Sequence, residues 1–333
     1  MRLGLTYDLQ TDPADERQAE FDPPGTMDAL ETALRTLGYH VTRLGNAAQL
    51  LAAPWRLEHV DLVFNIAEGS HGRCREAWVP MLLEQWNVPC VGSGAAAQAL
   101  GLDKVMSKRL AQASGLPTPR WCVVTDAAQL SRAPVPPFPV IVKPRHEGSG
   151  LGIDPGAVVS DADALQRRVA WVIDRFRQPC LIESFIPFAE LTVFLIGNRP
   201  PMAFPAIQRP LDPVSRLSCH VARAAGSGWF CPAQLTPDVD REAHRIAVGV
   251  FDALRCRDWA RVDLRLDAEG RCYFLEINPL PSVDPAGSLG LLAEYLGTTY
   301  AALVGQVVEA ALMRLGKPLR AAHRPAPAPR IAA

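Results

Sequence analysis

Short apolar runs alternate with amphipathic stretches along the first hundred residues. Residues 3–7 (LGLTY) form one such run, and apolar residues then recur at helical spacing from Met27 to Leu37. A second apolar run, Val60 to Ile66, precedes a polar loop and another helical stretch. Strands that alternate with helices predict a parallel sheet. We therefore expect an N-terminal α/β domain over residues 1–100.

The middle of the chain is predicted to be a separate domain built around a glycine-rich loop. The pattern predicts a helix from Asp103 to Ala113 and a strand over Trp121–Val124. A short apolar strand, residues 140–142, then enters the segment KPRHEGSGLGI, which separates it from another strand at 157–160. This placement predicts a hairpin loop. We assign residues 101–182 to a central domain.

The glycine-rich loop has the composition of a flap that closes over phosphate groups. Backbone N–H groups at Gly148, Ser149 and Gly150 can bind phosphate oxygens, and Lys143 stands beside them. Neither a GxxxxGK[ST] nor a GxGxxG sequence opens a helix here, which argues against a P-loop or a dinucleotide fingerprint. Taken alone, the segment is equally consistent with an ordinary glycine-rich turn.

The last third of the chain contains the clearest strand pattern. Trp259–Leu266 and Cys272–Asn278 alternate apolar and polar residues on either side of the turn sequence at 267–270, which predicts a hairpin. We assign residues 183–316 to a C-terminal domain with a mixed sheet. Residues 317–333, rich in proline, alanine and arginine, are expected to be a disordered tail.

The predicted hairpin places polar side chains on one face. Arg261 and Asp263 share one side of the first strand. Glu276 and Asn278 share one side of the second strand, opposite Leu275. If the two polar faces coincide, two carboxylates and an amide supply the oxygen ligands that Mg²⁺ prefers. The alternative is an ordinary solvated face of an antiparallel sheet.

Composition narrows the function classes. With 48% hydrophobic residues, 21% charged residues and a formal net charge of -1, the chain lacks the basic excess of duplex-binding surfaces. No apolar run reaches the roughly 18–20 residues that span a bilayer, and the N-terminus turns acidic where a signal peptide would stay apolar. We expect a cytoplasmic protein that binds neither nucleic acid nor membranes.

Cysteine and lysine usage add two observations. The eight cysteines are scattered without a CxxC pair, which argues against a zinc site or a redox dithiol. Only four of the 34 basic residues are lysines: Lys104, Lys108, Lys143 and Lys317. A chain that otherwise uses arginine can keep lysine where a compact ammonium group is required, although chance is an equally good explanation for any one of them.

Several motifs in the same order resemble the ATP-grasp superfamily, and within it the D-alanine-D-alanine ligases. They are VGSGAAAQALGLDKVMSK, FPVIVKPRHEGSGLGI, LIESFIPFAELTV, WFCPAQL and ARVDLRLDAEGRCYFLEINPLP with Ser288-Leu289 after it. The resemblance runs from about Val60 to Leu289. It implies an ATP-grasp fold, α/β at the N-terminus and α+β in the C-terminal part.

The resemblance implies a role for each matching position. The ATP-binding residues would be Lys104, Lys143, Glu147, Gly148, Ser149, Gly150, Glu183, Phe185, Ile186 and Glu190. Asp263, Glu276 and Asn278 would hold Mg²⁺, with Mn²⁺ as the other metal that fits. Arg261 would stabilise an oxyanion, with Ser149 and Ser282 as further catalytic residues. The substrate residues would be Glu76, His71, Ser288 and Leu289.

The implied reaction joins two amino acids, as in peptidoglycan synthesis. A substrate carboxylate attacks the γ-phosphate of ATP, and an amine then attacks the acylphosphate to form a peptide bond. D-Alanine is the first substrate to expect, and a homodimer through the N-terminal domain is implied. Two alternatives remain: a nucleotide-binding protein without catalysis, and an ATP-grasp enzyme that uses a different acceptor.

Departures from the family pattern lie on the substrate side. The family's N-terminal loop carries a Glu that anchors an ammonium group, and TYDLQTDPADERQAEFDPPG has no evident counterpart. The HGxxGEDG segment is replaced by EGSHGRCREAWVP, in which Glu68, His71 and Glu76 are candidate substitutes. The second flap serine is Gly150. The Lys and Tyr of the family's mobile loop have no clear counterpart, the available cations being Arg216, His220 and Arg223.

Overall fold

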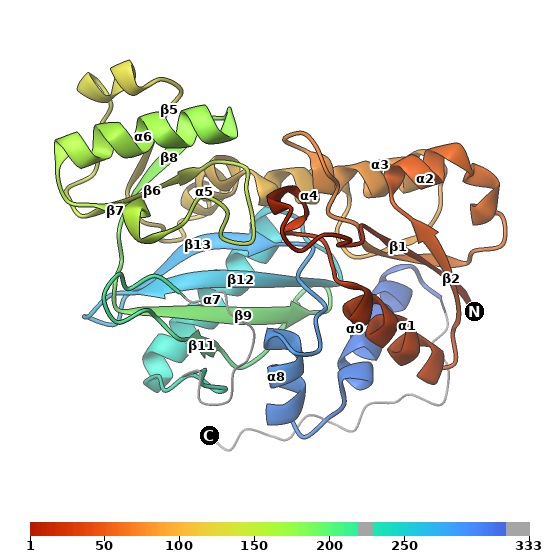
Figure 1. Cartoon of the computed structure of the whole chain (residues 1–333). Helices are drawn as coiled ribbons and strands as arrows, with labels where there is room; N and C mark the ends of the chain where they lie inside the picture. Colours follow the sequence, from red (N-terminus) through yellow and green to blue (C-terminus); the bar gives the residue numbers. More distant parts are fainter. Residues whose placement is uncertain (219–228, 318–333) are drawn as a thin grey trace.

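The computed structural model describes residues 1–218 and 229–317. The first of its three sheets is parallel, in the order β2-β1-β3-β4. Its strands are β1 (Arg2–Tyr7), β2 (His40–Gly45), β3 (Leu62–Ile66) and β4 (Cys90–Val91). The helices between them are α1 (Pro24–Thr36), α2 (Ala47–Ala52) and α3 (Trp78–Gln85). The parallel sheet predicted for the first hundred residues is confirmed (Figure 1).

The second sheet is antiparallel and carries the glycine-rich loop. Its order is β5-β8-β6-β7. The strands are β5 (Trp121–Val124), β6 (Val140–Pro144), β7 (Val158–Val159) and β8 (Cys180–Ser184). Helix α6 (Ala162–Phe176) buries Leu165, Val169 and Val172 against this sheet. The predicted hairpin around the glycine-rich loop is therefore present, because β6 and β7 pair antiparallel on either side of it.

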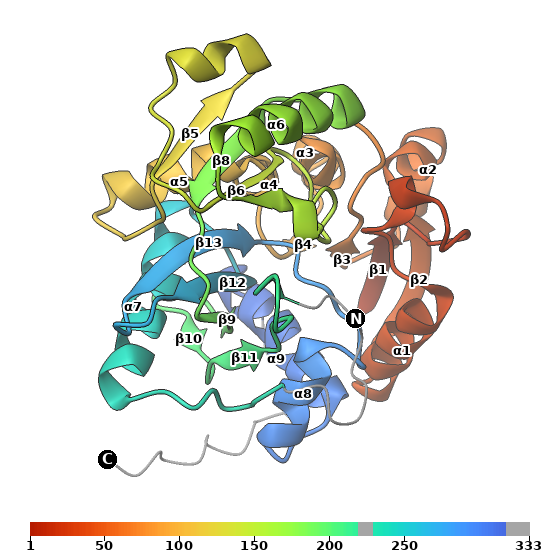
Figure 2. The same cartoon turned by 60° about the vertical axis from the view of Figure 1, so that its left-hand side comes forward.

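The third sheet forms the floor of the site. Its order is β10-β9-β12-β13, and β11 pairs with β9. The strands are β9 (Ala189–Ile196), β10 (Met202–Ala203), β11 (Ile207–Arg209), β12 (Trp259–Leu266) and β13 (Cys272–Asn278). Both predicted strands of the hairpin have the expected bounds. The second sheet lies above the β13 edge of the third in Figures 1 and 2.

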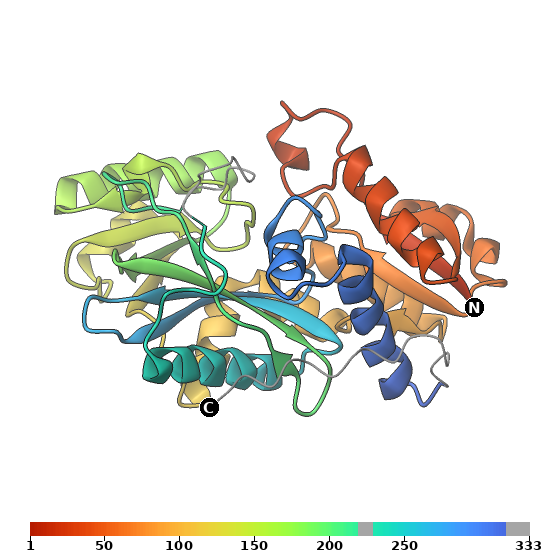
Figure 3. The same ribbon diagram turned by 90° about the horizontal axis from the view of Figure 1, so that it is seen from below.

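Helices cover the third sheet and join it to the first. They are α4 (Ala95–Leu102), α5 (Lys104–Ala113), α7 (Pro237–Ala253), α8 (Ser288–Tyr295) and α9 (Tyr300–Arg314). Helix α7 lies along one face of the sheet (Figure 3) and buries Ile246 and Val250 there. Helix α9 packs against α1, so the two ends of the described chain share one core. Within it, the rings of Phe64 and Trp259 meet edge to face at 6.0 Å.

A β-bulge corrects one predicted side-chain direction. Asp263 pairs with Glu276, but Leu264 pairs with Phe274, so Leu275 is the extra residue on β13. The strict two-residue alternation expected from the sequence therefore breaks at this point. Leu275 lines the same cavity as Glu276 instead of facing the opposite side of the sheet.

Two other features bear on sequence expectations. No single helix in residues 1–218 and 229–317 is long and apolar enough to cross a membrane; α8 and α9 pass that test only when counted together, and they are bent by 103°. The predicted tail lies, from residue 318 onward, outside the described residues, as do His220 and Arg223. Strand β8 continues to Ser184, past the predicted domain boundary at 182.

Candidate active site

A buried chain of charges connects α5 with the second sheet. The carboxylate of Glu183 on β8 lies between two ammonium groups, 2.6 Å from Lys108 Nζ and 2.6 Å from Lys143 Nζ. Lys108 and Glu183 are almost completely buried. Burial lowers the pKa of Lys108 to about 8, with Lys143 adding to the effect. Burial raises the pKa of Glu183, but its two ammonium neighbours lower it further, so the carboxylate is charged.

The polar faces of β12 and β13 coincide, as the sequence suggested they could. Arg261 pairs with Asn278 across the strands, and Asp263 pairs with Glu276. Arg261 Nη2 lies 2.9 Å from Asp263 Oδ2, and Thr192 on β9 donates to Asp263 Oδ1 at 2.7 Å. The two carboxylates, the amide and the guanidinium group therefore project from one sheet face.

Lys104 connects this polar face to the glycine-rich loop. Its Nζ lies 3.1 Å from Glu276 Oε2 and donates to the backbone carbonyl of Glu147. The side chain is held at the N-terminus of α5, where the Asp103 carboxylate caps the helix by accepting from two backbone N–H groups. Burial lowers the pKa of Lys104, but Glu276 raises it further, and the pKa of Glu276 is correspondingly well below its usual range.

Two cavities meet at Glu276. The linker cavity lies under the β8–β9 connection and is lined by Lys143, Glu183, Phe185, Ile186, Glu190, Asp263, Leu275 and Glu276, among others. The acidic cavity, of about 260 Å³, lies where the glycine-rich loop, the β12–β13 face and the N-terminal loops meet. Its lining includes Glu20, Asp22, Glu68, Glu76, Lys104, Ser149, Arg261, Glu276, Ser282 and Asp284. Arg209 and Glu276 line both cavities.

Glu190 lies in the linker cavity but already has two basic partners. Its carboxylate is 2.9 Å from Arg265 Nη2 and 3.3 Å from Arg209 Nη1. All three side chains are at least nine-tenths buried. The Arg265 guanidinium also lies 5.7 Å above the ring of Phe185. Glu190, one of the predicted ATP-binding residues, thus lies at the cavity and is held in place by two arginines that the sequence patterns did not indicate.

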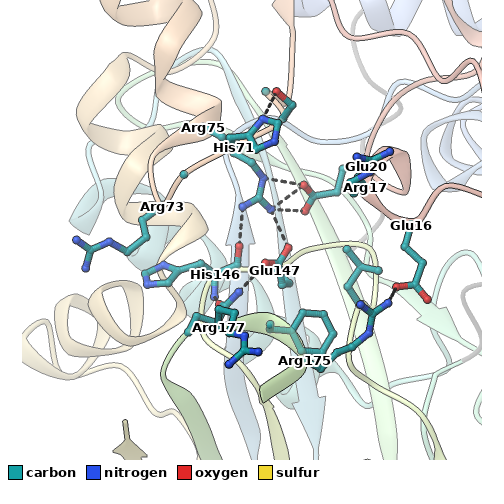
Figure 4. Close-up of a pocket in the computed structure, with 16 residues that line it drawn as sticks. Glu16, Arg17, Glu20, His71, Arg73, Arg75, His146, Glu147, Arg175 and Arg177 are labelled. Carbon is teal, nitrogen blue, oxygen red and sulfur yellow. Dashed lines mark hydrogen bonds and ion pairs between the residues drawn. The ribbon is translucent and has the colours of Figure 1, made fainter. Parts of the chain in front are cut away.

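The glycine-rich loop is tied to the N-terminal domain by Glu20 and Arg75, as Figure 4 shows. Arg75 Nη2 donates to Glu20 Oε2 at 2.7 Å, and Arg75 Nη1 donates to the carbonyl of His146 at 2.9 Å. Glu20 Oε1 accepts from the backbone N–H of Gly148 at 2.7 Å. We call these three contacts the loop latch. Ser149, with a φ of 47°, turns the chain at the tip.

Four carboxylates of the acidic cavity stand close together in two pairs. Burial raises the pKa of Glu76 to about 8, and burial with the charge of Glu76 raises that of Glu68 well above its usual value. Burial and the charge of Asp284 raise the pKa of Asp22 to about 7. Burial is the first cause of each of these shifts, and the charge of a nearby carboxylate adds to it.

The remaining predicted residues lie in different places. Glu76 and Ser282 line the acidic cavity. His71 is exposed and lines a neighbouring cavity of about 420 Å³, together with Glu20 and Arg75 (Figure 4), and it does not line the acidic cavity with Glu76. Ser288 begins α8 and the side chain of Leu289 is buried in the core, and neither lines the acidic cavity.

The donor set fits a magnesium ion only with help from a ligand. Asp263, Glu276 and Asn278 offer hard oxygen atoms on one face, which is the chemistry Mg²⁺ prefers. No group of three or more His, Cys, Asp or Glu side chains within the described ranges is arranged to hold a metal ion. The site therefore suits a cation whose remaining ligands are water and phosphate oxygens.

Comparison with known proteins agrees with this geometry. A family model described as the D-Ala D-Ala ligase C-terminus matches residues 110–309. D-Alanine-D-alanine ligase from Bordetella avium is 33% identical over 259 residues, which cover 75% of this chain and 79% of that protein. The chain belongs to the D-alanine-D-alanine ligase family. The family resemblance and the ligase class inferred from the sequence are thereby confirmed.

One further similar protein and one similar crystal structure accompany this assignment. An uncharacterized protein, y4sG, from Sinorhizobium fredii is 34% identical over 260 residues, 76% of this chain and 75% of that protein. The crystal structure of D-alanine-D-alanine ligase from Bacillus anthracis in complex with ATP has a TM-score of 0.74 at 21% identity, covering 94% of this chain and 98% of that one. The second likeness confirms the ATP-grasp fold.

Three features of the site were not predicted from the sequence. Lys108 was noted as one of four lysines, but nothing in its helix indicated that it contacts Glu183. Glu20 lies in the N-terminal loop where no anchor was recognised, and only the fold brings it to Gly148. Asp22 and Asp284 are 262 residues apart in sequence, so no local spacing could have joined them.

Proposed function

We propose that this chain is an ATP-dependent ligase that joins two amino acids through an acylphosphate intermediate. The observation that carries the proposal is the meeting of two cavities at Glu276, with Lys104 and Arg261 beside it. A nucleotide in the linker cavity would direct its phosphates toward Glu276, and a carboxylate substrate would approach from the acidic cavity. That arrangement brings donor and acceptor of a phosphoryl group together.

The first chemical step would be phosphoryl transfer. A carboxylate oxygen of one amino acid attacks the γ-phosphorus of ATP, and the bond to the β-phosphate oxygen breaks, releasing ADP. Lys104 and Lys143 stabilise the negative charge of the phosphates. A magnesium ion held by Asp263, Glu276 and Asn278 neutralises phosphate oxygens when bound. The flap residues Gly148 to Gly150 exclude water, which would otherwise hydrolyse the acylphosphate.

The second step would form the amide bond. The uncharged amine nitrogen of the other amino acid attacks the acyl carbon, and the tetrahedral oxyanion develops near the Arg261 guanidinium. Burial lowers the pKa of Arg261, but Asp263 beside it raises it further, so the group is charged. The carbon–oxygen bond to phosphate then breaks, inorganic phosphate leaves, and the nitrogen loses its proton. Ser282 and Ser149, which line the same cavity, are the further catalytic candidates.

The substrate contacts are part of the proposal. Glu76, which lines the acidic cavity and has no hydrogen-bond partner in the described residues, would bind an ammonium group in place of the family's N-terminal anchor. Glu20 is less suited, since Arg75 already balances its charge. The homodimer, the cytoplasmic location and a role in peptidoglycan synthesis stay predictions from the resemblance.

The deciding experiment measures release of ADP and phosphate with Mg²⁺-ATP. A panel of D- and L-amino acids is supplied singly and in pairs, and the products are analysed by mass spectrometry. We expect release that requires an amino acid and yields a condensed product. Nucleotide binding without release across the whole panel would contradict the ligase and favour a nucleotide-binding protein without catalysis. A phosphorylated product without an amide would favour a different acceptor.

A further inference from the structure

The basic side chains that line the acidic cavity are already paired. Each has a carboxylate within ion-pair distance, and Arg209 shares its carboxylate, Glu190, with Arg265. The pairs are Lys104 with Glu276 at 3.1 Å, Arg261 with Asp263 at 2.9 Å, and Arg209 with Glu190 at 3.3 Å. Arg75 does not line the cavity, and it forms an ion pair with Glu20 at 2.7 Å. No basic side chain among the described lining residues is left to balance a further negative charge.

Four lining carboxylates remain after this pairing: Asp22, Glu68, Glu76 and Asp284. No described basic side chain forms an ion pair with any of them. Asp284 accepts only from the backbone N–H of Ala286, at 2.9 Å. Glu76 is the most informative, because its side chain faces the cavity, is only 9% exposed and has no hydrogen-bond partner within the described chain. A buried carboxylate without a partner is costly, so a ligand cation would relieve it.

The four carboxylates come from separate elements and form two pairs. Glu68 and Glu76 lie on either side of the loop between β3 and α3. Asp22 precedes α1, and Asp284 lies in the loop between β13 and α8. Within each pair, burial and the charge of the neighbouring carboxylate raise the pKa of one member: Asp284 acts on Asp22, and Glu76 acts on Glu68. Since Glu68 also feels the charge of Asp22, both pairs face one ligand space.

Two pairs exceed what one α-amino acid requires. The α-ammonium group of the amino acid that is phosphorylated satisfies one carboxylate pair. The amine of the other amino acid is uncharged when it attacks, so it leaves the second pair unbalanced. A metal ion is a poor alternative occupant, because the described residues contain no group of three or more His, Cys, Asp or Glu side chains arranged for one. The nearby magnesium ligands Asp263 and Glu276 point instead from the β12–β13 face.

We infer that one of the two joined amino acids is a diamino acid, whose α-ammonium group binds one carboxylate pair and whose side-chain ammonium group binds the other. This inference rests on the proposed ligase function and narrows its substrate class. It also accounts for the absence of a recognisable single anchor in the N-terminal loop. Selectivity arises because a neutral side chain would leave one of the two carboxylate pairs without a counter-ion.

The test compares amino acids that differ only in the second ammonium group. Ornithine is matched with norvaline, lysine with norleucine, and 2,4-diaminobutyrate with 2-aminobutyrate, each as the D and the L isomer, alone and paired with alanine. Amino-acid-dependent ADP release by the full chain gives kcat/KM for each. We expect the diamino member of at least one pair to exceed its neutral match about tenfold or more. Equal or faster turnover of every neutral match overturns the inference but leaves the ligase intact.

Variants locate the selectivity. Asp22→Asn and Glu68→Gln should each reduce the preference for the diamino member about tenfold, whereas Glu58→Gln, an exposed glutamate remote from the cavity, should retain it. An unchanged preference in both cavity variants overturns the inference. If these variants do not fold, the wild-type chain with Mg²⁺-ADP answers the question, since ornithine should raise its Tm more than norvaline does. Absence of ADP release with every amino acid contradicts the ligase itself.

Discussion

The linker cavity and the acidic cavity differ in whether their charged side chains have ion-pair partners within the protein. Around the linker cavity, each buried charge has an opposite charge within the protein: Glu183 has Lys108 and Lys143, and Glu190 has Arg209 and Arg265. In the acidic cavity, Asp22, Glu68, Glu76 and Asp284 have no ion-pair partner among the described residues, and the pKa values of the first three are raised, chiefly by burial. The linker cavity holds two cations for Glu183 and two for Glu190 before any ligand arrives, which suits phosphate groups, whereas the acidic cavity requires a cation.

This difference indicates where each cavity gets its specificity. Ion pairs hold the side chains of the linker cavity in fixed positions, which suits a nucleotide whose shape is the same in every turnover. Unbalanced carboxylates select for the charge of the ligand that completes them. Residues of the linker cavity should therefore control catalysis and stability, while residues of the acidic cavity should control substrate choice and pH dependence.

The largest effect is expected at the junction of the cavities. Glu276→Gln removes a carboxylate that faces both cavities and pairs with Lys104. We expect kcat to fall by roughly 10³-fold or more, because charge stabilisation in the phosphoryl-transfer transition state is lost. ADP release measures this, and circular dichroism verifies the fold. Unimpaired turnover would disprove the metal and phosphate role. Glu269→Gln, in the exposed turn of the same hairpin, is the matched control.

The second largest effect, a loss of stability, is expected at the ion pairs of Glu183. Lys108→Met leaves Glu183 with one buried partner, and we expect the free energy of unfolding to fall by about 3–5 kcal/mol. Urea denaturation measures it. Glu183→Gln, which leaves both Lys108 and Lys143 without this carboxylate, should lower the free energy of unfolding at least as much. A Lys108→Met variant as stable as wild type would show that packing, not charge pairing, holds this region together.

The loop latch predicts an intermediate effect confined to nucleotide binding. Arg75→Ala removes the contacts to Glu20 and to the His146 carbonyl, so the flap loses its support from the N-terminal domain. We expect the KM for ATP to rise about tenfold with kcat reduced less, since the chemical groups remain. Steady-state kinetics separate the two. Arg73→Ala, in the same loop, should leave both constants near wild type.

The smallest effect, a dependence of stability on pH, is expected at the carboxylates of the acidic cavity. The pKa of Asp22 is raised from 3.8 to about 7 in the folded chain, so the folded state holds a proton that the unfolded state has lost between these values. The free energy of unfolding should therefore fall as pH rises from about 4 to 7. Asp22→Asn should flatten the dependence. A profile identical to wild type would show that Asp22 is not the group responsible.

Sequence reasoning predicted most of the fold where the signal is local. The bounds of β5, β12 and β13 and the end of α5 follow from alternation and turn residues, which operate within a few residues. The direction of Leu275 was wrong because a bulge breaks alternation without an unmistakable sequence mark. His71 and Glu76 were both named as substrate candidates because they stand in the segment that replaces HGxxGEDG, yet they line different cavities.

By itself, the sequence determined the family, the alternation of strands and helices in the first hundred residues and the polar face of the hairpin, since these depend on residue type and short-range periodicity. Only the tertiary structure decided which charges meet. Lys108 and Glu183 are 75 residues apart, and Asp22 and Asp284 are 262 residues apart. Coulomb interactions depend on distance in space and on burial, and neither is encoded in local spacing. The ion pairs of the linker cavity and the unpaired carboxylates of the acidic cavity therefore arise only when the three sheets come together.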